Sequence, residues 1–421
     1  PADCLLAIRN ARLALATDPD DHFAYKFLAI AYRDLLAHES ALIAGIEPTV
    51  ENATRLAQVP TRVDLLDLRF LQRLTALNYA IQTAPPPRDE VSREDLARLH
   101  FELAQAYRVA GFVDLAYDNY RAAYELIPPD ARTEAFDSQL GQIEQAKDQI
   151  DQALDQAKLV PNVSQIDLAN RAMDLGAPQF ALDQLETANN LNIAPQVTQP
   201  MLMDLYCQIG QPDGASKVYQ ELGNNPGLRP AEVAFRQGRY RVLLGDYDGA
   251  RESWSGPVGS ITATRSERVV NELLTAMSFV KGTPEPFLAG FVNQAGAQST
   301  RALASYHFNL GLILLESGDP IEAGDSFTKA LELQPDLAVR PVMEYYLNQL
   351  GRPIPPLPDR LANAVASNTS DQSSSATESS PSAPATVAEP ATDKPGEPRP
   401  QGEPTPTDPP PPTNPDGVGE V

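Results

Sequence analysis

The sequence has few of the residues from which catalytic and metal centres are usually built. Two cysteines, Cys4 and Cys207, cannot form a disulfide framework or a four-thiolate zinc site. The four histidines are scattered, and no two have the i, i+4 spacing of a zinc-binding helix: His22, His38, His100 and His307. No phosphate-binding glycine loop, nucleophile elbow or kinase signature occurs. We therefore expect no catalytic residue, no metal site and no cofactor, and thus a protein that is not an enzyme.

The chain also lacks long apolar runs and an excess of positive charge. Its longest apolar stretch, Leu273–Val280, is far shorter than the ~20 residues needed to cross a bilayer, and no signal segment opens the chain. The chain has 33 basic and 56 acidic side chains, so its formal net charge is −23. Nucleic-acid binding needs clustered Lys and Arg. We expect neither a transmembrane segment in this chain nor a nucleic-acid partner.

The composition changes abruptly after Leu361. Residues 362–421 contain no Leu, Ile, Met, Phe, Tyr, Trp or Cys, and they hold 13 of the 39 prolines. Such a segment cannot bury enough apolar area to offset the entropy of ordering, so it is predicted to be a disordered, acidic, Pro/Ser/Thr-rich tail. The tail is either a solvated tether or a proline-motif ligand, in which case Pro409–Pro412 is the best docking point.

A repeat of about 34 residues dominates the rest of the chain. Glycines recur at Gly176, Gly210 and Gly245, and an alanine follows each by five residues, at Ala181, Ala215 and Ala250. The clearest copy is Leu103, Ala104, Tyr107, Gly111, Ala116, Tyr120, Ala123 and Pro128. The same steps recur at Leu310, Gly311, Leu314, Gly318, Ala323, Phe327, Ala330 and Pro335. One spacing that occurs so often predicts a repeated helix–turn–helix unit.

Each residue type in the repeat suits a pair of packed antiparallel helices. Steps of three and four place Leu103, Ala104 and Tyr107 on one stripe of the first helix. Gly111 permits the left-handed backbone that ends this helix, and Pro128 ends the second one. The sequence therefore predicts an all-α fold, an α-solenoid of about eight or nine hairpins that melts gradually because each repeat contacts only its neighbours.

These residues resemble the tetratricopeptide repeat family. The segment Tyr306–Pro335 matches the family's consensus almost throughout, Leu103–Pro128 matches it nearly as well, and a fainter copy is expected within Asn271–Gly296. The resemblance implies a right-handed superhelix of helical hairpins, whose concave wall is lined by first helices and holds a peptide or a partner helix. It therefore implies a non-catalytic scaffold for protein–protein interaction.

The resemblance also indicates which side chains would line this groove. In the subset that clamps acidic chaperone tails, Lys and Asn on successive first helices hold a carboxylate. Here Lys26 fits but Ile30 replaces the Asn, so this clamp is incomplete. Two arginines one turn apart could hold a partner carboxylate, or they could be paired with nearby acids. The candidate groove residues are Phe101, Asn170, Arg236, Arg239, Phe308 and Asn309.

One segment, Glu134–Leu159, departs from the repeat. Its apolar residues alternate in steps of four and three, as in a coiled-coil seam, and Lys147 interrupts them. The seam is formed by Phe136, Leu140, Ile143, Ile150, Leu154 and Ala157. The segment is either an elongated repeat helix that packs on its neighbours or a surface for self-association or partner docking.

The expected organisation has four parts. Residues 1–88 form degenerate hairpins, of which the first is truncated, and residues 89–161 form a hairpin and the long helix. Residues 162–361 form the main array, closed by a capping helix at Leu337–Leu350, and residues 362–421 form the tail. Ser92 and Ser164 are predicted to cap first helices.

The truncated first hairpin suggests a second hypothesis for the function. The chain would then be a soluble appendage of a larger protein or enzyme, membrane-anchored or not, where it recruits a substrate or partner. Tails rich in Ser, Thr and Pro are common in exported bacterial proteins. The sequence leaves open whether the chain lies in a bacterial cytoplasm or outside it.

Overall fold

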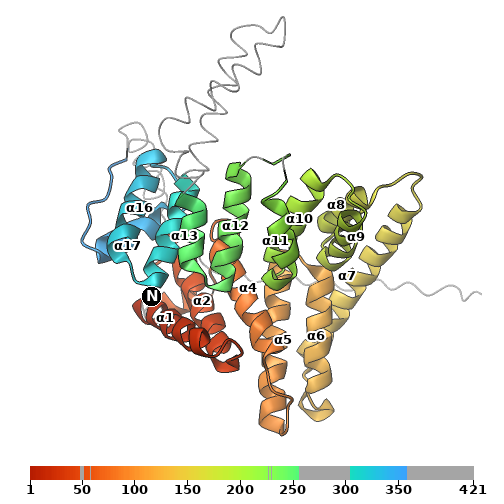
Figure 1. Ribbon diagram of the computed structural model, residues 1–421. Helices are drawn as coiled ribbons and strands as arrows, with labels where there is room; N and C mark the ends of the chain where they lie inside the picture. The colour runs from red at the N-terminus through yellow and green to blue at the C-terminus, as the bar shows by residue number, and fades with distance from the viewer. Residues whose placement is uncertain (48–51, 57, 226, 229, 256–303, 358–421) are drawn as a thin grey trace, which may run out of the picture. The chain divides into compact units, whose positions relative to one another are not determined.

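A computed structural model shows the chain to be built from α-helices and short 3₁₀ helices (Figure 1). It describes residues 1–47, 52–56, 58–225, 227–228, 230–255 and 304–357. No strand occurs in these ranges, so the predicted all-α fold is confirmed. They all lie within the first of two compact units, Pro1–Asn363 and Ala364–Val421. The predicted disordered tail and the repeat copy at Asn271–Gly296 lie outside the described residues.

Within the described ranges, most of the helices are joined by short turns. They are α1 (Ala2–Thr17), α2 (His22–Ile43), α3 (Ala53–Leu56), α4 (Asp67–Gln82), α5 (Glu90–Ala110), α6 (Val113–Leu126), η2 (Pro129–Ala131), α7 (Glu134–Lys158), α8 (Gln165–Leu175), α9 (Pro178–Asn190), α10 (Pro195–Gln208), η3 (Pro212–Ala215), α11 (Ser216–Leu222), α12 (Pro230–Leu244), α13 (Tyr247–Ser255), α16 (Pro320–Leu333) and α17 (Arg340–Gln349). Residues 304–317 are helical as well and precede α16.

Helices that follow one another pack as hairpins, among them α5 with α6, α8 with α9, and α12 with α13. The backbone turns through a glycine with positive φ after each of several first helices: Gly111, Gly176, Gly210, Gly245 and Gly318. These turns give the chain the helix–turn–helix unit that its repeat predicts.

The predicted N-caps have different outcomes. Ser164 caps α8 and forms a capping box with Asp167, as predicted. The prediction for Ser92 is wrong, because α5 begins earlier and Asp89 is its cap. The carboxylate of Asp89 accepts the Ser92 backbone N–H at 2.8 Å, which places Ser92 at the third position of the helix. Asp is as favourable at the N-cap as Ser, and the helix begins after Asp89, the earlier of the two residues.

Helix α4 is buried on nearly all sides, which is unusual for a repeat helix. It packs against α2, α5, α10 and α12, and Figure 1 shows it between α2 and α5. Its buried side chains lie all round the helix: Leu68, Arg69, Phe70, Leu71, Gln72, Leu74, Thr75, Ala76, Leu77, Asn78 and Ala80. Burial on every side is typical of a helix inside a domain and not of one at its surface. The array is therefore folded around one of its own helices.

The helices at the start of the chain, α1 and α2, also contact the last helices that the structure describes. Helix α17 packs against α2 as well as against its neighbour α16. From α1, Arg9 donates hydrogen bonds to the backbone carbonyl oxygens of Leu315 (2.6 Å) and Glu316 (3.2 Å). The Tyr346 hydroxyl donates to Glu39 at 2.8 Å. Contacts in this chain are thus not confined to neighbouring repeats, as the sequence alone had led us to expect.

Because of these contacts, we expect one cooperative unfolding transition and not the gradual melting of an open repeat array. Urea unfolding would be followed by far-UV circular dichroism and by hydrogen–deuterium exchange of α2 and the 304–317 helix. Both helices should lose protection at the urea concentration where the dichroism signal falls. Separate midpoints for the two helices would contradict this expectation.

The long helix α7 packs against its sequence neighbours α6 and α8. Four residues of the predicted seam are buried in the core: Phe136, Ile143, Ile150 and Leu154. The interrupting Lys147 pairs with Asp151 one turn later on the same helix. The seam is thus covered by the chain's own helices, and self-association through Glu134–Leu159 stays a prediction.

Candidate functional site

The two aromatic groove candidates face the core of their own hairpins. The Phe101 ring lies edge-on to Tyr120 and to Phe136, with both centroid distances at 5.6 Å. Phe308 is 3% exposed, and its ring centroid lies 6.3 Å from that of Phe327. Phe308 is thus buried in its hairpin, and Phe101 is half-buried against its own.

The two arginine candidates pair with carboxylates on other helices. From α12, the Arg236 Nε lies 2.9 Å from the Asp204 carboxylate of α10. The Arg239 Nη2 lies 3.0 Å from the Asp67 carboxylate at the start of α4. Burial raises the pKa of Asp204, and the charge of Arg236 opposes this shift. The structure thus shows the second of the two roles that the sequence left open, arginines paired with nearby acids.

The six candidates lie on four helices, α5, α8, α12 and the 304–317 helix, and they differ in exposure. Asn170 is exposed on α8, whereas Asn309 is half-buried on the 304–317 helix. The two arginines share α12, and the two phenylalanines are directed into different hairpins. In addition, α4 packs against α10 and α12, two of the first helices that the family resemblance leads us to expect in the groove wall.

A different surface on a first helix is exposed and apolar. Phe23, Phe27 and Ile30 on α2 are 65%, 59% and 39% exposed. Their spacing of i, i+4 and i+7 aligns them on one side of the helix, which we call the exposed α2 face. The buried stripe of α2 lies on another side, where Leu28 and Tyr32 are 1% and 0% exposed. Helix α2 is thus apolar on two sides, and the residues that the structure describes cover only one of them.

Charged side chains border the exposed α2 face on the side of α5. Lys26 forms an ion pair with Asp95 of α5 and lies 5.6 Å from the centroid of the Phe23 ring. One helical turn beyond Ile30, Arg33 lies 3.6 Å from Glu102 of α5. An apolar centre with a polar rim is the usual composition of a protein–protein interface.

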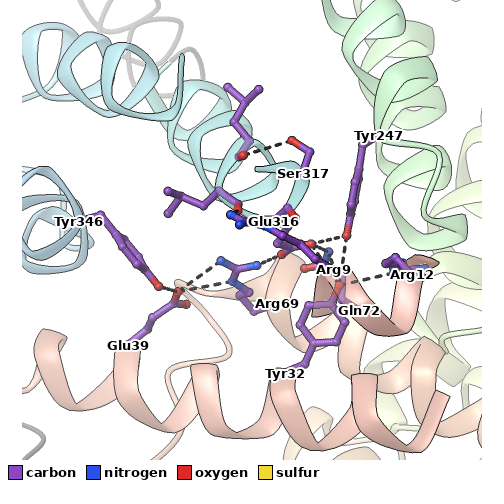
Figure 2. A network of polar contacts seen from close by, with 12 residues as sticks. Arg9, Arg12, Tyr32, Glu39, Arg69, Gln72, Tyr247, Glu316, Ser317 and Tyr346 are labelled. Carbon is purple, nitrogen blue, oxygen red and sulfur yellow. Dashed lines mark hydrogen bonds and ion pairs between the residues drawn. The ribbon is translucent and has the colours of Figure 1, made fainter. Parts of the chain in front are cut away.

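Behind this face, a buried polar network joins α2 to distant parts of the chain (Figure 2). Arg69 of α4 lies between two fully buried carboxylates, Glu39 of α2 and Glu316 of the 304–317 helix. The Glu316 carboxylate also accepts hydrogen bonds from the Tyr32 hydroxyl at 3.1 Å and from the Gln72 amide at 2.9 Å. Further donors are Tyr247 to Glu316 and Tyr346 to Glu39.

The charges of this network require their partners. Burial alone lowers the pKa of Arg69, but the carboxylate of Glu39 and the neighbouring tyrosine hydroxyls together outweigh it, so the pKa is raised and the guanidinium stays charged. Burial raises the pKa of the Tyr32 hydroxyl, which therefore stays a neutral donor. A buried charge that loses its partner is strongly destabilising. The network thus fixes α2 against α4, α17 and the 304–317 helix and makes the exposed α2 face a rigid platform.

Sequence reasoning missed both the exposed α2 face and the network behind it. A signal for the face existed, because Phe23, Phe27 and Ile30 add a second apolar stripe to a helix that already has one. A weaker signal existed for the network, since Arg69 and Gln72 interrupt the apolar pattern of α4. Neither signal identifies the partner of these residues.

In the part of the chain that the structure describes, no group of His, Cys, Asp or Glu side chains is arranged to hold a metal ion. None of the helices there is long and apolar enough to cross a bilayer.

One family of known proteins is similar to part of this chain. A family model of the tetratricopeptide repeat matches residues 304–337, which comprise the 304–317 helix, α16 and the turn after it. No curated protein matches the chain in sequence. The matched hairpin, within a chain that is helical throughout its described ranges, makes this a tetratricopeptide-like helical protein, and such repeats support a general role in protein–protein interaction.

Proposed function

We propose that this protein is a non-catalytic scaffold that binds an amphipathic helix or an extended peptide of a protein partner on the exposed α2 face. One observation carries the proposal: Phe23, Phe27 and Ile30 lie exposed in register on one first helix. Apolar anchors at i, i+4 and i+7 are the pattern by which helices bind to one another. Large exposed apolar patches are uncommon on soluble proteins unless they bind something.

The position of α4 favours the exposed α2 face as the binding site over the sides of the first helices α10 and α12. Helix α4 packs against α10 and α12, and its Asp67 is paired with Arg239. A peptide would have to displace a helix that is buried on nearly all sides. The exposed α2 face needs no such rearrangement, since its phenylalanine side chains are already in contact with solvent.

The double substitution Phe23→Ser, Phe27→Ser tests the proposal. We expect at least about tenfold weaker partner binding, because buried aromatic anchors provide most of the affinity of an interface. The stability of the free protein should change by less than about 1 kcal/mol, since both rings are exposed. The partner would be cross-linked to the full chain, identified, purified and titrated against each variant by calorimetry.

The control is a second pair of exposed apolar residues, Val91→Ser and Ile321→Ser, which are 75% and 70% exposed on α5 and α16. These substitutions remove similar apolar area but should leave the affinity unchanged. Equal losses in both double variants, or native affinity in the Phe23, Phe27 variant, would mean that the partner does not bind the exposed α2 face.

A further inference from the structure

A cavity lies between α7 and α8, where the chain turns from one helix into the other, and we call it the α7–α8 pocket. Its volume is about 390 Å³, within the range of about 300–1,000 Å³ that is usual for ligand pockets. Most of the residues that line it are apolar, and they come from both helices and from the turn between them: Ala153, Ala157, Val160, Val163 and Leu168.

Apolar side chains at this turn are exposed to solvent. Val160, which lines the α7–α8 pocket, is 54% exposed, and its neighbour in the chain, Leu159, is 82% exposed. Leu168 on the α8 side of the pocket is buried. Adjacent exposed apolar residues beside a cavity are typical of a surface that binds another molecule.

The same pocket contains a cation without an acidic partner. Arg171 of α8 lines the pocket and is exposed. Asp167 stands one helical turn before it, at the i, i+4 spacing from which an acid commonly pairs with an arginine. The Asp167 carboxylate instead accepts from the Ser164 hydroxyl at 2.7 Å, as part of the capping box of α8. Within the described ranges, neither Asp167 nor any other acid forms an ion pair with Arg171.

A second cavity shows how the chain neutralises such a cation with its own residues. Its volume is about 300 Å³, and Arg251 of α13 lies in its wall. Arg251 pairs with Glu322 of the same wall and lies 3.5 Å from Asp319. The arginine of this cavity therefore has its counter-charges in the chain, whereas Arg171 of the α7–α8 pocket has none among the described residues.

We propose that the α7–α8 pocket binds a peptide segment of another protein in which a large apolar side chain stands next to a carboxylate. The apolar side chain would fill the space between α7 and α8, and the carboxylate would pair with Arg171. An arginine and a carboxylate can form two parallel charge-assisted hydrogen bonds. A guanidinium is also more weakly hydrated than an ammonium, which suits it to a pocket with an apolar lining.

The net charge of the chain restricts this partner further. A chain of net charge −23 repels acidic molecules at long range. The attraction of Arg171 for a carboxylate acts over a few ångströms, so the apolar side chain must first bring the carboxylate to it. A segment with a single acid beside its apolar residue fits the pocket better than a run of acids.

This site goes beyond the proposed function and does not depend on it. Figure 1 shows α7 and α8 apart from α2, with α4, α5 and α6 between them. A partner could use either site alone. The loss of one should therefore leave binding at the other intact.

The test uses the full chain and two unlabelled peptides of glycine and serine that contain one phenylalanine, preceded in one peptide and followed in the other by a glutamate. Binding is measured by titration with saturation-transfer difference NMR, which detects weak ligands. We expect Arg171→Gln to weaken the binding of a glutamate peptide about tenfold, from the strength of a charge-assisted hydrogen bond. Peptides with glutamine in place of glutamate should bind more weakly and should not respond to this substitution.

A second variant, Ala157→Leu, fills the pocket and keeps Arg171. It should weaken the glutamate and glutamine peptides alike, because both lose the space for the phenylalanine ring. Native affinity in Ala157→Leu would overturn the proposal. So would equal binding of the glutamate and glutamine peptides to the native chain, or no binding of either glutamate peptide.

The matched control is Arg93→Gln, which removes one exposed arginine from α5. Equal losses for Arg93→Gln and Arg171→Gln would show only an effect of net charge and would overturn the proposal. Sedimentation tests another occupant, since a dimer that forms in the native chain and not in Ala157→Leu would assign the pocket to a second copy. If circular dichroism shows that Ala157→Leu is unfolded, the comparison of the two arginine variants decides.

Discussion

Replacing Arg69 by methionine should lower the free energy of unfolding by about 3–5 kcal/mol, because the substitution leaves buried carboxylates without their cation. Glu39 and Glu316 are both fully buried, and both lie against this one guanidinium. Methionine fills similar volume, so the loss would come from charge and not from a cavity. Urea unfolding followed by circular dichroism measures the change.

Two further variants separate the charge effect from a general effect of losing an arginine. Arg62→Met breaks a surface pair with Asp64, whose side chains are 39% and 63% exposed, and should cost less than about 1 kcal/mol. The triple variant Arg69→Met, Glu39→Leu, Glu316→Leu should be more stable than Arg69→Met alone, because no buried charge is left unpaired. A triple variant less stable than the single one would contradict the assignment of the loss to charge.

The second large effect is expected at the bend between α8 and α9. Gly176 has φ of +82°, and a Cβ at this position would overlap the backbone oxygen of Gly111. The Gly176 carbonyl oxygen also accepts the Val113 backbone N–H at 2.7 Å, so the bend is held against the start of α6. Gly176→Ala should therefore combine about 1–2 kcal/mol of left-handed strain with about 1–3 kcal/mol of overpacking.

Gly111→Ala is the matched control for this bend. Its φ of +79° is nearly the same, but nothing lies within 4 Å of an added Cβ. The control should show the strain alone, about 1–2 kcal/mol. Urea midpoints of the two variants compare the effects directly. Equal losses for Gly111→Ala and Gly176→Ala would mean that the close approach of the two bends does not contribute.

The helical hairpins could be predicted from the sequence because their signals are local. The glycine that ends α8 and the Ser164 cap that begins it lie within one helix length of each other. Such signals act through hydrogen bonds between residues a few positions apart. They fix where a helix begins and ends without any knowledge of the rest of the chain.

The surroundings of α4 could not be predicted in this way. Arg69 and its partner Glu316 lie in different hairpins, and Tyr346 and Glu39 are 307 residues apart. A single sequence shows that Arg69 is a polar residue in an apolar helix, but not which carboxylate will reach it. The sequence pattern predicts contacts between neighbouring repeats, and here contacts between distant ones also bury α4.

The surroundings of the groove candidates could not be predicted for a related reason. A first helix in a hairpin has apolar residues on more than one side, and spacing alone does not say which side meets the second helix. Phe101 and Phe308 occupy comparable places in the two clearest repeats, and both rings pack inward. On α2, by contrast, the side chains of Phe23 and Phe27 are exposed to solvent.

The long sequence separation within the polar network has a consequence during synthesis on the ribosome. Glu316 is added 244 residues after Gln72, its hydrogen-bond partner on α4. Until Glu316 has been added, Arg69 of α4 lacks one of the two carboxylates that pair with it in the folded protein. This helix can therefore be enclosed only after residues 304–317 have left the ribosome, and nascent chains arrested before residue 304 should be the forms that chaperones retain.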